Sequence, residues 1–180
     1  MTKPTGREET FKTLLLRELV LEPRLAEEFE LTDLLQAPCE EEGADPVLMA
    51  LDKGASIAEL GLEKPLKKEL KRKKLFSFTK PMAEQVESID EEGEKYRTYC
   101  QLAACDGVAR APARANRLLE EAESIEADWA RHRHLRGLVQ GLRKNYEDAR
   151  LDLQEALENE PFMNGKVRIG QALEHCEKYL

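Results

Sequence analysis

Small and apolar residues recur at a fixed separation in the C-terminal half of this chain. Four pairs lie 34 residues apart: Ala103 and Gly137, Ala115 and Ala149, Leu119 and Leu153, and Ala122 and Ala156. Ala127 and Pro161 have the same separation. Two helices approach closely only where the residues between them are small, because those side chains set the distance between the helix axes. The recurrence therefore predicts successive pairs of closely packed helices.

The composition also favours helices. Of the 180 residues, 41% are hydrophobic, 36% are charged and only 6% are aromatic. Leucine, glutamate, alanine, lysine and arginine dominate, and these residues favour helix over strand. The length is sufficient for one sizeable domain, or for a small domain with a short repeat array. We expect an all-α fold.

The clearest pattern lies between Ala130 and Pro161. Within NYEDARLDLQEALENEP the informative residues are Tyr146, Ala149, Leu153, Ala156, Leu157 and Pro161, and Gly137 is the small residue of the preceding helix. This pattern resembles the tetratricopeptide repeat (TPR), a helix-turn-helix unit of about 34 residues. The resemblance covers residues 96–161 and implies about two antiparallel hairpins, followed by a capping helix over 165–180.

The chain departs from the family pattern at several positions. Arg136 stands where the family usually has leucine, and Gln140 stands where it prefers tyrosine. The first unit is degenerate, because Pro112 and an expected loop over 105–114 interrupt it. We therefore expect one well-defined hairpin after a less regular one, together forming a TPR-like domain over 81–180.

Residues 1–80 are expected to form an N-terminal helical region that packs on the repeats and completes their core. Apolar spacing predicts helices over 8–21, 23–36 and 46–51, a short helix after Ser56, and a basic helix over 64–75. The acidic stretch over 37–46 is expected to be a loop. A further helix is predicted over 82–99, with a new start near Gly93, which weakens its middle.

In the repeat family, the first helix of each unit lines a concave groove, and its second, fifth and ninth positions often contact the ligand. The resemblance places these positions at Arg131, His134 and Leu138 in one unit and at Arg97, Cys100 and Ala104 in the other. Such a groove would be basic with an apolar floor. Because arginine forms paired hydrogen bonds with carboxylates, we expect an acidic or mixed peptide as its ligand.

A basic segment over 64–74 is a second candidate surface. Its cations are Lys64, Lys67, Lys68, Lys71, Arg72, Lys73 and Lys74. It would suit an acidic partner, an anionic membrane surface or RNA, and it would equally suit a solvated face that pairs with the acidic runs of the chain itself.

Nothing in the sequence points to an enzyme. There is no Walker loop, GxGxxG or HExxH motif. His132 and His134 are two residues apart, a spacing that points them to different sides of a helix rather than at one metal. The four cysteines, Cys39, Cys100, Cys105 and Cys176, lack CxxC spacing and are expected to be small core residues. We expect no catalytic, cofactor-binding or metal site.

Charge and hydropathy narrow the partner class. The net charge of −8 argues against general nucleic-acid binding, which depends on clustered cations. The apolar runs fall well short of the roughly 20 residues that a membrane span needs, and no secretory signal is recognisable. We expect a cytoplasmic, non-enzymatic adaptor or scaffold that binds another protein. The alternatives are a structural subunit of a larger assembly and a small chaperone for a specific client.

Overall fold

The computed structural model describes residues 10–22, 46–72, 85–109, 111–125 and 130–180. These residues form helices and turns and contain no strand, which confirms the expected all-α class for this part of the chain. The helices are α1 (Phe11–Val20), α4 (Pro46–Asp52), α5 (Glu63–Arg72), α7 (Glu92–Val108), α8 (Pro112–Glu123), α9 (Ala130–Leu142), α10 (Tyr146–Asn159) and α11 (Met163–Glu177). The helix expected over 23–36 and most of the acidic loop lie outside the described residues.

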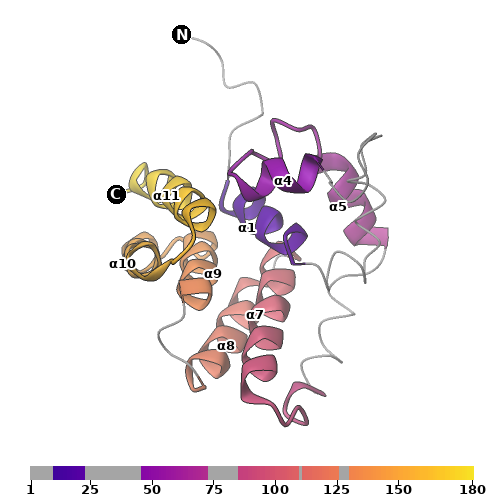
Figure 1. Cartoon of the computed structure of the whole chain (residues 1–180), viewed down its shortest axis with the longest axis vertical. Helices are drawn as coiled ribbons and strands as arrows, with labels where there is room; N and C mark the ends of the chain where they lie inside the picture. Colours follow the sequence, from indigo (N-terminus) through magenta and orange to yellow (C-terminus); the bar gives the residue numbers. More distant parts are fainter. Residues whose placement is uncertain (1–9, 23–45, 73–84, 110, 126–129) are drawn as a thin grey trace.

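Two helical hairpins, α7–α8 and α9–α10, form one side of the molecule (Figure 1). Three residues separate α9 from α10, and three separate α7 from α8. Both the end of the first helix and the start of the second lie 34 residues further along the chain in the later hairpin. Lys144 closes the α9–α10 turn with a left-handed backbone, φ 65°.

Small residues allow α9 and α10 to pack closely. A β-carbon at Gly137 would lie 2.7 Å from Leu153 Cγ and 3.2 Å from the Ala149 carbonyl oxygen. Ala149, Leu153 and Ala156 are fully buried. The residues with the 34-residue recurrence therefore lie at the contact between helices, as the sequence predicts.

The two departures from the repeat pattern form polar contacts between helices. Arg136 donates to both carboxylate oxygens of Asp152 on α10, each at 2.9 Å, and pairs with Glu123 on α8. Gln140 donates to the side-chain oxygen of Asn116 on α8 at 3.1 Å. These contacts join α9 to both neighbouring helices where the family pattern would have apolar contacts.

The N-terminal helix α1 lies at the centre of the fold, with α7, α9 and α11 around it and α4 and α5 nearby (Figure 1). Every residue of α1 except Lys12 is buried. Thr10 caps the helix by accepting a hydrogen bond from the Thr13 amide at 3.1 Å. One hydrophobic core contains residues of α1 together with Leu51, Leu66 and residues of α7 to α11.

Several local expectations are corrected. The loop expected over 105–114 is much shorter, because α7 continues through Gly107 to Val108 and the turn is confined to 109–111. The segment after Ser56 forms turns rather than a helix, since Gly61 has a left-handed backbone, φ 67°. The short helix that begins at Pro46 is present as α4, and Gly54, φ 108°, follows it closely.

Candidate interaction site

Helix α1 lies in a channel between α7 and α9. Phe11 meets Gly141 near the end of α9, and Leu15 meets Gly107 near the end of α7. Toward the other end of α1, Glu18 meets His134, and Glu22 contacts both Arg131 and Gln101. Residue numbers rise along α1 as they fall along both partners. The helix therefore runs antiparallel to α7 and to α9.

Two glycines shape this channel. A β-carbon at Gly107 would overlap the Leu15 side chain, and a β-carbon at Gly141 would overlap the Phe11 ring. The glycines lie 34 residues apart, so they are equivalent positions of the two hairpins. Phe11 and Leu15 are four residues apart, about one helical turn. Each hairpin thus provides one recess for one large side chain of α1.

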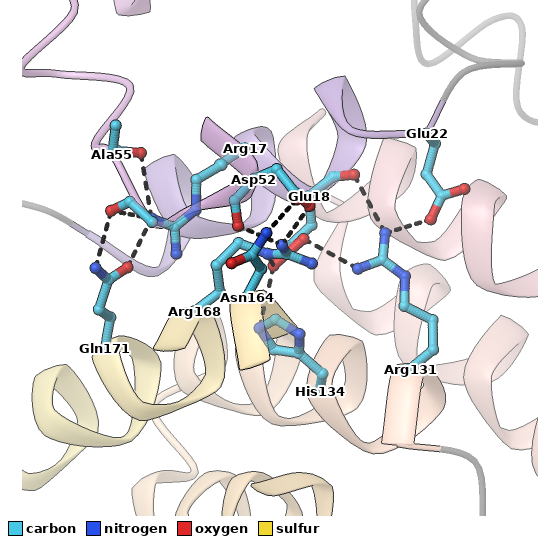
Figure 2. Close-up of polar contacts among 11 residues, drawn as sticks. Arg17, Glu18, Glu22, Asp52, Ala55, Arg131, His134, Asn164, Arg168 and Gln171 are labelled. Atoms are coloured by element: carbon cyan, nitrogen blue, oxygen red, sulfur yellow. Dashed lines mark hydrogen bonds and ion pairs between the residues drawn. The ribbon is translucent and has the colours of Figure 1, made fainter. Parts of the chain in front are cut away.

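Glu18 is the centre of a polar network at the other end of the channel (Figure 2). Its carboxylate is fully buried and accepts hydrogen bonds from Arg131 Nη1 at 3.0 Å and from Arg168 Nε at 3.1 Å. His134 Nε2 lies 3.4 Å from the same carboxylate. One acidic side chain of α1 therefore joins α9 to α11.

The surrounding groups keep Glu18 ionised. Burial by itself raises the pKa of this carboxyl, but the positive charges of His134 when protonated, Arg131 and Arg168 outweigh burial and lower it. Burial lowers the pKa of His134 to about 4, although Glu18 opposes the change. At neutral pH the network therefore contains a carboxylate, two guanidinium groups and a neutral imidazole.

The network continues to the residues around the end of α4. Arg168 Nη1 donates to the carbonyl oxygen of Asp52 at 2.7 Å and to its carboxylate at 2.8 Å. Arg17 Nη1 donates to Gln171 Oε1 at 2.7 Å and to the carbonyl oxygen of Gly54 at 3.1 Å. Figure 2 shows these contacts on either side of Glu18. Helices α1, α9 and α11 and the residues after α4 are thereby held together.

A cavity of about 570 Å³ opens where α1 ends. It is lined by Leu21, Glu22, Asp52, Ala130, Arg131, Asn159, Glu160, Pro161, Phe162 and Arg168. A neighbouring cavity of about 350 Å³ shares Asp52, Glu160, Phe162 and Arg168. Phe162 is 73% exposed and the adjacent Met163 is 70% exposed. A projecting apolar pair therefore lies beside a polar cavity.

The residues expected to line the ligand groove have different fates. Cys100, Ala104, His134 and Leu138 are buried, Arg97 is exposed, and the Arg131 side chain is 25% exposed. Arg131 and His134 come together at Glu18, so Arg131 does bind carboxylates, but these belong to the same chain. The surface available to another molecule is therefore largely made of other residues.

The expected basic surface lies partly on α5. Lys68 and Lys71 are exposed, whereas Lys67 pairs with Glu63 at 2.5 Å. Leu66 and Leu70 are buried on the opposite side of this helix. The side chain of Arg72 and the residues Lys73 and Lys74 lie outside the described residues.

The described histidines and cysteines occupy structural positions. His132 Nε2 lies 3.0 Å from the Leu119 carbonyl oxygen on α8, so His132 and His134 point to different helices. Cys100, Cys105 and Cys176 are buried, and burial raises the pKa of the Cys100 thiol to about 12. Cys39 lies outside the described residues. Within the described ranges no group of three or more acidic, histidine or cysteine side chains is arranged to hold a metal ion.

Sequence reasoning missed Glu18, Asp52, Phe162 and Arg168. Glu18 and Arg168 are 150 residues apart, so no local pattern connects them. Phe162 and Met163 did carry a signal, because two large apolar residues directly follow the helix-ending Pro161.

Comparison with family models, curated proteins and solved structures finds no match to this chain. Among the described helices, none is both long and apolar enough to cross a membrane.

Proposed function

We propose that this chain is a non-enzymatic adaptor that binds another protein through the surface around Phe162, with TPR-like hairpins as its scaffold. The TPR-like interpretation follows from the sequence resemblance and is supported by the 34-residue offset between equivalent helix ends in α7–α8 and α9–α10. The observation that carries the proposal is the exposure of Phe162 and Met163 beside the 570 Å³ cavity.

This surface has the composition of a protein-binding site. A projecting aromatic residue supplies apolar area, and the polar residues at the cavity supply directional contacts around it. The channel between α7 and α9 cannot supply this surface directly, because α1 fills it.

The charges favour a mixed partner segment over a purely acidic one. Arg131 already pairs with Glu18 and Glu22, and Arg168 already pairs with Glu18 and Asp52. A strongly acidic segment would have to compete with these carboxylates. A segment that packs an apolar side chain on Phe162 and presents both donors and acceptors to the cavity does not meet this competition.

Affinity purification of the tagged full-length chain tests the proposal. Phe162→Asp with Met163→Asp removes the apolar pair, and Leu151→Asp is the matched control, because Leu151 is 54% exposed on α10 and lines neither cavity. We expect specific partners to be retained by the wild type and by the control and lost by the double variant. Identical sets of bound proteins for all three chains would contradict the proposal. A complex of fixed stoichiometry would identify the chain as a structural subunit.

A further inference from the structure

We infer that the channel between α7 and α9 is a helix-recognition site, with α1 as its built-in ligand and an amphipathic helix of a partner protein, carrying the same side-chain pattern, as its external ligand. This inference goes beyond the adaptor proposal and does not depend on the surface around Phe162.

The pattern consists of Phe11, Leu15, Glu18 and Glu22. In a helix, residues at the first, fifth, eighth and twelfth positions lie along one face. Each of the four meets a matched group: the two apolar side chains meet glycines, and the two carboxylates meet cationic or polar side chains. The channel therefore reads one stripe of a helix from end to end.

The apolar half of the stripe is selected by shape. The recesses at Gly107 and Gly141 belong to equivalent positions of successive hairpins, so the repeat itself sets their separation. A helix with small residues at the matching positions would leave both recesses unfilled. Unfilled space in a packed interface is unfavourable, because the residues that line it lose contacts.

The acidic half is selected by charge. A helix with an apolar residue in place of Glu18 would leave Arg131 and Arg168 without their shared carboxylate, and a helix with a basic residue there would be repelled. Buried ion pairs of this kind contribute more to selectivity than to net stability. The Glu18 network therefore distinguishes between helices while adding little to the hold on any one of them.

Because α1 belongs to the same chain, it competes at a high effective concentration, on the order of millimolar for a short linker. A partner helix binds the channel only where it outcompetes α1. Weakening the contacts of α1, without altering any channel residue, should therefore open the site to a helix added in solution.

The test uses the full-length chain and a fluorescent synthetic peptide of residues 10–22, TFKTLLLRELVLE. The chain carries Leu15→Ala, which removes one contact of its own α1. We expect the peptide to bind this variant at least tenfold more tightly than it binds the wild type, as measured by fluorescence anisotropy. A peptide with Glu18→Arg should bind the variant at least tenfold more weakly.

Two further measurements keep the outcome decisive. If Leu15→Ala does not fold, Phe11→Ala, which removes only the contact at the start of α1, takes its place. The peptide should also raise the melting temperature of the variant as its concentration rises, because a ligand that binds only the folded state stabilises it. Equal binding by wild type and variant, or by the two peptides, would overturn the inference. Phe162→Asp should leave peptide binding unchanged, which separates this outcome from that of the adaptor proposal.

Discussion

Leu15 of α1 occupies the space that a β-carbon at Gly107 of α7 would require. Glycine inside a helix costs about 0.5–1 kcal/mol relative to alanine, because it loses more conformational freedom on folding. Helix α7 therefore has lower intrinsic stability at the point where it admits α1. The same relationship holds between Phe11 and Gly141 on α9. Both hairpins are shaped around the N-terminal helix.

Gly141→Ala should destabilise the protein although alanine is the better helix former. The added β-carbon overlaps the Phe11 ring, and overpacking of this kind costs about 1–3 kcal/mol. Gly170→Ala is the matched control, because a β-carbon there meets no atom within 4 Å. It should stabilise α11 by up to about 1 kcal/mol. Urea denaturation measures both. A Gly141→Ala protein as stable as the wild type would show that Phe11 does not fill this recess.

Glu18→Gln should cost about 3 kcal/mol of unfolding free energy, because it removes the charge that Arg131 and Arg168 share in a buried site. Lys67→Ala, which breaks the partly exposed pair with Glu63 on α5, should cost less than about 1 kcal/mol. Chemical denaturation of the two variants compares a buried ion pair with an exposed one. Similar small losses in both would mean that Glu18 is not central to the fold.

His134 should make the fold sensitive to mild acid. Burial lowers its pKa from the ordinary 6.5 to about 4, so between these values the unfolded chain binds a proton that the folded chain does not. The free energy of unfolding should therefore fall as the pH drops through this window, by roughly 3 kcal/mol in all, and be unaffected by His134 above it.

His134→Gln should remove this slope. Below the ordinary pKa of Glu18, 4.5, stability should fall in both proteins, because the lowered pKa of Glu18 keeps it ionised in the folded state while it is protonated in the unfolded state. Urea titrations at a series of pH values measure the two profiles. Parallel profiles above pH 4.5 would contradict the assignment.

The described cysteines should be unreactive in the native protein. Burial raises the pKa of Cys100 from 9.0 to about 12, which reduces the thiolate fraction roughly a thousandfold at neutral pH. Burial also raises the pKa values of Cys105 and Cys176. Iodoacetamide labelling, followed by mass spectrometry of each peptide, should modify these three thiols only after unfolding. Rapid labelling of Cys100 in native buffer would refute this.

The class of the fold and the close packing of α9 on α10 were predictable from the sequence, because both depend on local spacing. The apolar residues of α1 and the small residues of α10 repeat at helical intervals. Gly107 was misjudged for the same reason. Glycine followed by Pro112 is typical of a loop, and only the contact with Leu15 on a distant helix explains why a glycine lies inside α7.

The polar network was only partly predictable. Arg131 and His134 stood out in the sequence, but their acidic ligand was expected in another protein rather than in α1. Arg17 and Glu18 were noted only as interruptions of an apolar run. Their burial depends on partners on α9, on α11 and after α4, and no local pattern encodes contacts across more than 100 residues.

The central claim is that the hairpins form a channel built around α1, and a double-mutant cycle on Leu15 and Gly107 tests it most directly. In the wild-type background Gly107→Ala should destabilise the protein by about 1–3 kcal/mol, because the new β-carbon meets Leu15. In the Leu15→Ala background the same change should be neutral or stabilising, because the recess is empty and alanine favours the helix. The coupling energy should exceed about 1 kcal/mol. An equal effect of Gly107→Ala in both backgrounds would contradict the account.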